Sequence, residues 1–200
     1  MDDLGGNGAF VTVNNADDSD IDINQIGADN WASVQVFDGT NNQAGIYQDG
    51  WQNEANIAIN GTDNDANIAQ RGDVNNANIT LTGVYNSTFI EQLASGGNAA
   101  IEYTGDNNKS SIFQDGVSAG TATINGDGDD NFARIDQRGS DLSDGSIVQI
   151  GDNNVAEIVQ GGSAQNAGLL NEAHILQTGT GNSASIVQAG SNNFAAVTQQ

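Results

Sequence analysis

Polar and apolar residues alternate along most of this chain, in a pattern N-x-A-x-I-x-Q-x-G-x-x that recurs every eleven residues. Clean copies occupy Asn64–Gly72, Asn154–Gly162 and Asn182–Gly190. An alternation of two is the period of a β-strand with one buried face, so the Asn, Ala, Ile and Gln positions should point inward. The glycine can take a positive φ in a tight turn. Each copy therefore predicts one strand followed by one turn.

A second period of about 22 residues lies on top of the first. In alternate copies the last inward position is a glutamine, at Gln25, Gln48, Gln70, Gln92, Gln114, Gln137, Gln160 and Gln188. In the copies between, this position is aliphatic or aromatic, at Val13, Val36, Ile59, Leu81, Tyr103 and then Ile124. Since like residues recur in every second strand, two strands should form one coil. The predicted fold class is an all-β β-solenoid of stacked strand-turn-strand coils, the arrangement of a cross-β fibre.

Seventeen half-repeats run from Val13 to Gln199, a stack roughly 40 Å long at about 4.8 Å per coil. One coil buries too little apolar surface to offset the entropy of ordering it, so coils need neighbours. Buried amides would be satisfied because each donates to the identical amide one coil further along. The predicted structural ladder comprises the eight glutamines above with Asn53, Asn64, Asn75, Asn154, Asn182, Ile57, Ile68, Ile79, Ile158 and Ile186. The predicted turn glycines are Gly50, Gly61, Gly72, Gly83, Gly105 and Gly116.

Three places disturb the regular spacing. Within residues 115–130 the inward set could be either Ala122 with Ile124 or Thr121 with Thr123. The turn that precedes the strand ending near residue 149 has one extra residue, and about six extra residues occur at 163–170. We expect variable loops at these places rather than domain boundaries.

The repeat array covers residues 19–200, and residues 1–18 form an N-terminal segment with a degenerate first repeat. The segment from Met1 to Leu4 has neither a basic region nor an apolar region. A secreted form would therefore have lost its signal, and Met1 would be an added start. No run of about 18 apolar residues occurs, which argues against insertion into a membrane.

Composition narrows the possible partners. The formal net charge is −22 with only four Lys and Arg residues, and cysteine and proline are absent. A phosphate binder needs a basic patch, so neither nucleic acid nor an anionic membrane surface is expected to bind. Without cysteine, no disulfide framework or thiolate metal site can form. High charge with low hydrophobicity is also typical of disordered chains, but the regular repeat favours a folded array.

The two ends of the predicted stack carry no proline, lysine or helix that would cover a strand edge. The predicted assembly edges lie in the strands 7–13 and 193–199, at Val11, Val13, Val197 and Gln199. We expect a second copy of the same chain to bind there, giving end-to-end growth. Because the number of half-repeats is odd, successive copies would either be rotated by about 180° or leave one end strand mismatched.

Most acidic residues fall in turns and at outward positions, and we interpret them as a solvated surface that keeps single copies soluble. Asp127, Asp129 and Asp130 are candidates for weak binding of a divalent cation, and no cofactor is expected. His174, the sole histidine, should point outward into solvent. No nucleophile–base pair stands out, so we do not expect an enzyme.

Two other secreted β-solenoids are alternatives. A calcium-binding β-roll would show nonapeptides of the form G-G-x-G-x-D-x-U-x. An ice-binding solenoid would show a flat outward array of threonines. The eleven-residue period and the mixed outward residues of this chain disfavour both.

The segments Gln48–Ala55 and Gln177–Gln188, with the pattern Q-x-G-x-x-N-x-A, resemble the repeat of curlins, the subunits of bacterial curli. The resemblance extends over roughly residues 19–200. It implies a secreted, extracellular functional amyloid of the biofilm matrix, which serves cell adhesion and surface attachment as a homopolymeric fibre. It also implies a related nucleator subunit and secretion or chaperone proteins as partners. The chain departs from many curlins in having more coils, aliphatic residues at alternate glutamine positions, and no evident glycine-rich N-terminal targeting segment.

Overall fold

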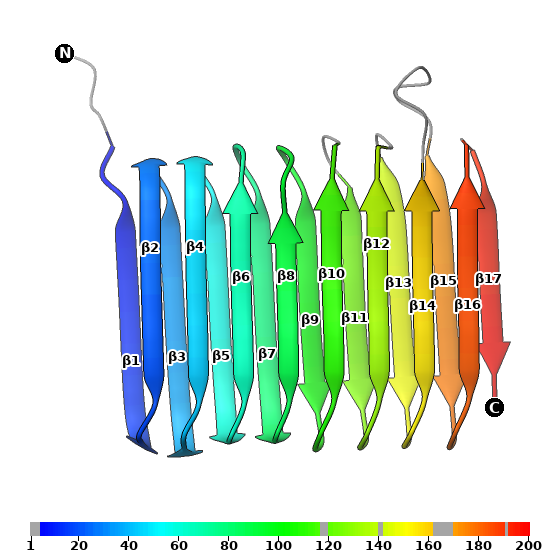
Figure 1. Cartoon of the computed structure of the whole chain (residues 1–200), viewed down its shortest axis with the longest axis horizontal. Helices are drawn as coiled ribbons and strands as arrows, with labels where there is room; N and C mark the ends of the chain where they lie inside the picture. The colour runs from blue at the N-terminus through cyan, green and yellow to red at the C-terminus, as the bar shows by residue number, and fades with distance from the viewer. Residues whose placement is uncertain (1–4, 117–119, 140–141, 162–169, 191) are drawn as a thin grey trace.

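The computed structural model describes residues 5–116, 120–139, 142–161, 170–190 and 192–200. Seventeen strands in these residues alternate between two sheets that lie face to face (Figure 1). The odd sheet contains β1 (Gly8–Asp17), β3 (Trp31–Thr40), β5 (Glu54–Thr62), β7 (Asn76–Val84), β9 (Asn98–Thr104), β11 (Thr121–Asp127), β13 (Ser143–Ile150), β15 (Asn171–Thr178) and β17 (Phe194–Gln199). The even sheet contains β2 (Asp20–Ala28), β4 (Gln43–Trp51), β6 (Asp65–Arg71), β8 (Ser87–Gln92), β10 (Lys109–Asp115), β12 (Phe132–Arg138), β14 (Val155–Gly161) and β16 (Ser183–Ala189).

Each strand pairs in parallel with the strand two places along the chain, so one odd and one even strand form a coil. The pairing keeps equivalent positions of the repeat side by side, as for Ile57 beside Ile79. Partners in successive coils are mostly 22 or 23 residues apart. The predicted β-solenoid with two-strand coils is therefore confirmed. Among the described residues, no helix has the length and apolar character needed to cross a bilayer.

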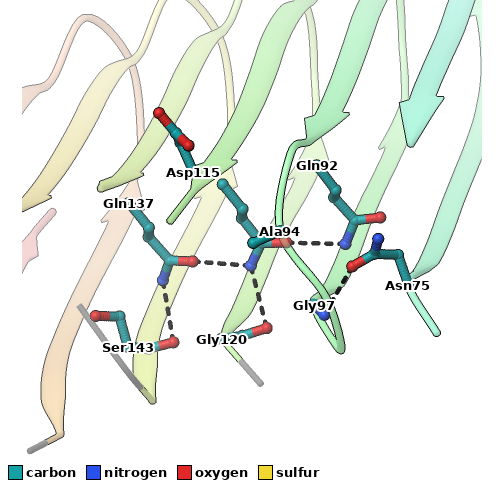
Figure 2. Close-up of a pocket in the computed structure, with 9 residues that line it drawn as sticks. Asn75, Gln92, Ala94, Gly97, Asp115, Gly120, Gln137 and Ser143 are labelled. Atoms are coloured by element: carbon teal, nitrogen blue, oxygen red, sulfur yellow. Dashed lines mark hydrogen bonds between the residues drawn. The ribbon is translucent and has the colours of Figure 1, made fainter. Parts of the chain in front are cut away.

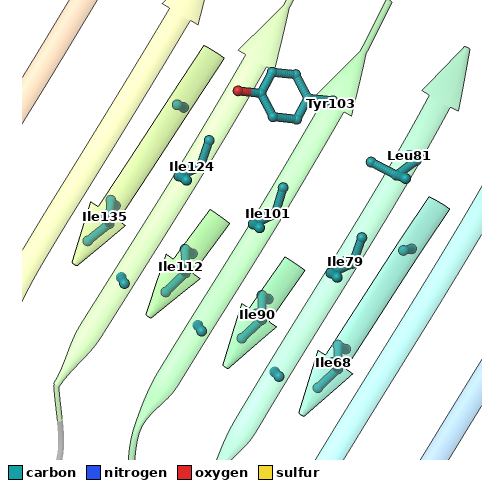
Figure 3. Packing of buried hydrophobic residues seen from close by; sticks show 14 of the residues in the cluster. Ile68, Ile79, Leu81, Ile90, Ile101, Tyr103, Ile112, Ile124 and Ile135 are labelled. Atoms are coloured by element: carbon teal, nitrogen blue, oxygen red, sulfur yellow. The ribbon is translucent and has the colours of Figure 1, made fainter. Parts of the chain in front are cut away.

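The core is a flat layer between the two sheets, filled by the Ala and Ile positions of the repeat. Rows of isoleucine run along the stack, and at most 2% of each of these residues is exposed: Ile57, Ile79 and Ile101 in the odd sheet and Ile68, Ile90 and Ile112 in the even sheet. Figure 3 shows Ile79 and Ile101 in one row and Ile68, Ile90 and Ile112 in the other. β-branched side chains suit this pleated surface because their χ1 angle is already restricted. Each coil buries its apolar residues largely against the coils above and below, so stability depends on stacking.

Most of the described turns combine a glycine, a variable residue, a residue with left-handed backbone and an asparagine. In the turn from Gly61 to Asn64, φ is 139° at Gly61 and 56° at Asp63. A Cβ atom on Gly61 would lie 1.9 Å from the carbonyl oxygen of Gly83 in the next coil. The coils approach so closely there that a side chain has no room, which explains the regular spacing of the glycines. All six predicted turn glycines have positive φ, namely Gly50, Gly61, Gly72, Gly83, Gly105 and Gly116.

Val74 occupies the left-handed position of its turn, with φ of 60°, where a β-branched residue is strained. Its side chain is largely exposed and gains little from packing. We expect Val74→Asn to raise the free energy of unfolding by about 1 kcal/mol, because asparagine tolerates this conformation. The urea midpoint measures the effect. Val84→Asn, at a turn position without positive φ, is the control, and an equal gain in both variants would contradict the backbone explanation.

The register of β11 corrects one expectation. Ala122 and Ile124 point inward, and Ile124 lies beside Ile101. The prediction that Ile124 follows Tyr103 in the row of last inward positions was wrong, because Gly126 holds that place. Only this register puts the Ala122 and Ile124 side chains into the alanine and isoleucine rows. The expected loop at 163–170 lies, apart from residue 170, outside the described residues.

Candidate assembly site

A continuous row of glutamine side chains runs along the inside of the even sheet. Each Nε2 donates to the Oε1 of the glutamine one coil later at 2.8–2.9 Å, through Gln25, Gln48, Gln70, Gln92, Gln114, Gln137, Gln160 and Gln188. The second amide hydrogen goes to a backbone carbonyl of the opposite sheet, as from Gln48 to the oxygen of Trp31 at 3.0 Å. The amides are thereby satisfied although they are buried, and the row joins the two sheets as well as the coils.

The corresponding row of the odd sheet changes character along the stack. It is aliphatic up to Leu81, continues through Tyr103 and Gly126, and then becomes glutamine. Gln149 donates to Gln177 at 3.1 Å and Gln177 donates to Gln199 at 2.9 Å. This second glutamine row was not predicted, although all three glutamines occupy the last inward position of their copies of the repeat.

Tyr103 connects the two halves of that row, and Figure 3 shows it next to Leu81, the last aliphatic member. A Cβ atom on Gly126, in the next coil, would lie 2.0 Å from Cε1 of Tyr103, so the phenol extends over the glycine. The Tyr103 hydroxyl donates to Oε1 of Gln149 at 3.2 Å, two coils further along. Gln149, the first glutamine of the row, thereby accepts from Tyr103 the hydrogen bond that a preceding glutamine would otherwise donate.

Burial raises the pKa of Tyr103. Since the folded state holds the phenol protonated, the stability it contributes is present below the unfolded pKa of about 10 and is lost as pH rises above it. We expect the urea midpoint to fall above about pH 10 more steeply in the unsubstituted chain than in Tyr103→Phe. The phenylalanine variant should be about 1–3 kcal/mol less stable at neutral pH, because the Oε1 of Gln149 loses its donor. Equal alkaline slopes in the two proteins would contradict the assignment.

Asparagine side chains form rows at the turns that precede the strands. Both N and Nδ2 of Asn53 donate to Oδ1 of Asn30, at 3.0 and 3.1 Å, and Nδ2 also donates to the carbonyl oxygen of Gly72 at 2.7 Å. The donation therefore runs toward the earlier coil, opposite to the glutamines. The expected donation from one amide to the identical amide of the adjacent coil is therefore present for asparagine, as from Asn53 to Asn30, and the short side chain also lies against the backbone of the turns. An unbroken row joins Asn42, Asn64, Asn86, Asn108, Asn131, Asn154 and Asn182.

The other asparagine row is interrupted where Gly97, Gly120 and Ser143 replace asparagine. Gly97 N donates to Oδ1 of Asn75 at 3.0 Å, but the buried Nδ2 of Asn75 has no partner in the described part of the chain. A cavity of about 10 Å³ lies beside these residues and the glutamine row (Figure 2). This is about the smallest volume that holds one water molecule. The break in the asparagine row therefore leaves a buried amide nitrogen without a hydrogen-bond partner in the middle of the stack.

Carboxylates of the turns accept hydrogen bonds from the neighbouring coil. Asp106 N donates to Oδ1 of Asp129 at 2.8 Å, and Nδ2 of Asn107 donates to Oδ1 of Asp130. Within the residues that the structure describes, no three His, Asp or Glu side chains gather in a way that could hold a metal ion. The cation candidates Asp127, Asp129 and Asp130 are therefore not brought together into a site.

The outer face of the even sheet carries all four basic residues of the chain, Arg71, Lys109, Arg134 and Arg138. Two of them enclose Asp136, which is 4% exposed: Arg134 Nη2 lies 2.8 Å from Oδ2, and Arg138 Nε lies 2.7 Å from Oδ1. The hydrogen bond to Asp136 raises the pKa of Arg138. Asp136 was not predicted as buried, although the alternation places residues 134, 136 and 138 on one face.

The outer face of the odd sheet is chemically mixed. His174 lies outward as predicted, with Nε2 2.8 Å from Oε1 of Glu172. Thr82 lies beside Thr104 in the next coil, but Thr80 pairs with Glu102 and Thr123 pairs with Ala100, so adjacent threonines do not continue along the face. The described outward positions therefore do not form the flat threonine array that the ice-binding alternative requires.

Among the residues that the structure describes, the strands at both ends of the stack are paired on one side only. β1 and β2 stand at one end, and β16 and β17 stand at the other. At the first end Val11 and Val13 are 48% and 47% exposed although they belong to the inward set. Val197 and Gln199 belong to the inward set of β17 at the second end. Soluble proteins usually protect such edges, because an open edge pairs readily with another strand.

Comparison with known proteins agrees with this geometry. The model of the curlin associated repeat matches residues 16–50 and 171–200, the regions that adjoin the two ends of the stack. A search of curated proteins found no match. The glutamine row of the even sheet continues between the two matched regions with the same hydrogen-bond pattern. The chain therefore carries the curlin associated repeat at both ends of its solenoid.

Proposed function

We propose that this protein is a structural subunit that assembles end to end into an extracellular, curli-like amyloid fibre. The observation that carries the proposal is the pair of open strand edges on a solenoid whose interior rows lack their next member at each end. A second copy of the chain offers the same rows and the same strand spacing. Stacking would pair the backbone edges and bury apolar positions such as Val11 and Val197.

The charge distribution is compatible with this role. The net charge of −22 keeps separate copies apart, and the stacked carboxylates of the turns, such as Asp106 and Asp129, repel one another along the stack. Salt screens such repulsion between exposed groups, so growth should be faster at higher ionic strength. The fibre would serve the biofilm matrix, cell adhesion and surface attachment, with no catalytic activity. A related nucleator and secretion or chaperone proteins would act on the subunit before assembly.

Seeded growth of the purified 200-residue chain tests the proposal. Preformed fibres added to fresh chain should remove the lag in thioflavin fluorescence, and the product should give a cross-β reflection at about 4.7 Å. A chain that stays monomeric at high concentration in salt, with and without seeds, would contradict the proposed function.

A further inference from the structure

The number of strands determines how two copies of this chain can meet. The described part of the chain forms nine strands in the odd sheet and eight in the even sheet. The position after β17 therefore belongs to the even sheet, whereas the first strand of the following copy, β1, is an odd strand. A solenoid that continues without a gap needs the following copy to be turned about the long axis of the stack.

We propose that successive copies are related by a half turn, with β1 of the following copy paired to β16 and its β2 paired to β17. This inference rests on the proposed end-to-end assembly and specifies its contact. Odd and even strands run in opposite directions (Figure 1). A half turn exchanges the two sheets and reverses their direction, so the following copy's odd strands run parallel to the even strands that they extend.

Copies without this rotation would leave a strand position empty. β1 of the following copy would pair with β17, and its β2 would lie one level beyond the edge of β16. The edges of β16 and of that β2 would then face a gap inside the fibre. Unpaired backbone groups in such a place are costly, since each would need a hydrogen-bond partner.

The ends of the glutamine rows favour the half turn. Gln199 Nε2 donates to the oxygen of Ser183 at 2.9 Å and has one further hydrogen, and Oε1 of Gln25 accepts no hydrogen bond within the described chain. The half-turn contact brings Gln199 to Gln25 of the following copy, with the direction of donation seen from Gln177 to Gln199. Unrotated copies would place Val13 against Gln199, and the amide hydrogen would have no acceptor there.

The asparagine rows fit the same contact. Within the stack an asparagine Oδ1 accepts the backbone N–H of the next coil, as Asn154 Oδ1 does from Asn182 at 3.0 Å. Oδ1 of Asn182 and of Asn193 accept no hydrogen bond from the described residues of the same copy. The half-turn contact would supply the N–H of Asn7 to the first and the N–H of Ser19 to the second.

The apolar positions also correspond across this contact. Val11 of the following copy would meet Ile186, and its Ile23 would meet Val197, so aliphatic residues continue both isoleucine rows. At one position the two facing side chains differ in polarity, because Gln188 would meet Val13. The half-turn contact therefore leaves one amide hydrogen unmatched, whereas the unrotated contact leaves an amide and two strand edges unmatched.

Paired cysteines report which contact forms, because the chain contains no cysteine of its own. Outward Thr198 and outward Asn24 would be neighbours in the half-turn contact, with Cα atoms about 4.8 Å apart, a distance that a disulfide spans. Outward Thr198 and Thr12 would be neighbours only without the rotation. Within one copy both pairs lie at opposite ends of the stack (Figure 1). We expect fibres of Thr198→Cys with Asn24→Cys to give crosslinked chains after mild oxidation, and fibres of Thr198→Cys with Thr12→Cys to give monomers on a denaturing gel.

If fibres of the Thr198→Cys and Thr12→Cys variant gave crosslinked chains, the half-turn contact would be overturned. It would also be overturned if both variants formed fibres and neither gave crosslinked chains. Either result would still be compatible with end-to-end assembly. Failure of the unsubstituted chain to form fibres would instead overturn the proposed function. Helical reconstruction of unsubstituted fibres provides a measurement that needs no variant. It should give a rotation close to 180° for each rise of about 40 Å, and a rotation close to zero would contradict the proposal.

Discussion

Gly61→Ala is expected to disrupt the coils on either side of its turn, lowering the free energy of unfolding by about 2–6 kcal/mol or preventing folding. The backbone at Gly61 has φ of 139°, and its Cβ would lie 1.9 Å from the carbonyl oxygen of Gly83. That oxygen belongs to the backbone of the stacked turn and cannot move without separating the coils. Circular dichroism and urea unfolding of the purified variant measure the effect.

Substitutions at two other glycines distinguish the effect of the short Cβ–oxygen distance on stability from the effect of the positive φ. Gly161→Ala is the matched control, because φ is not positive at Gly161 and the nearest atom would be 3.9 Å from the new Cβ. It should change stability by less than about 0.5 kcal/mol. Gly181→Ala has open space but φ of 73°, and should cost about 1 kcal/mol. A loss in Gly61→Ala no larger than that in Gly181→Ala would show that the coils do not meet so closely.

Removing two adjacent members of the glutamine row, with Gln70→Ala and Gln92→Ala, should slow seeded growth and lower the free energy of unfolding by about 3–6 kcal/mol. Gln92 accepts from Gln70 and donates to Gln114, both at 2.9 Å. The double variant leaves a buried donor on Gln48 and a buried acceptor on Gln114 without partners, and it opens space in the core. Urea midpoints and thioflavin growth rates at equal seed mass measure the two effects.

The outward pair Asn67→Ala and Glu91→Ala is the matched control on the same two strands. It removes a surface ion pair between Glu91 and Arg71, with a distance of 3.1 Å, which should contribute less than about 1 kcal/mol. Growth should therefore remain close to that of the unsubstituted chain. If the outward pair slowed growth as much as the inward pair, the glutamine row would not be what holds the coils in register.

The strands and their register could be predicted because two simple periods act together. Side chains of a strand alternate between faces, so the positions of Ile68 and Gln70 in the repeat identify the inward face. The constant length of the coil then places Ile68 beside Ile90 and Gln70 beside Gln92. Where the coil length changes, around residues 117–119, the alternation alone left two registers open.

The features that could not be predicted depend on contacts between coils rather than on one coil's pattern. Tyr103 reaches Gln149 because Gly126, between them, lacks a side chain, and the sequence shows this only once the register of β11 is known. The direction of the asparagine rows depends on where the turn carbonyls lie, as for Gly72 beside Asn53. Such geometry is set by packing, and no single repeat contains it.

The number of residues between two glutamines of adjacent coils does not control whether their side chains form a hydrogen bond. Gln160 donates to Gln188 at 2.9 Å across 28 residues, while Gln48 donates to Gln70 at the same distance across 22. The interior side chains therefore hold the spacing of the coils, whatever the number of residues between them. A foreign peptide inserted near residue 165 should therefore leave the stacked coils unchanged. Polymerised subunits would then display the peptide once per molecule at regular intervals, as a scaffold for enzymes or antigens.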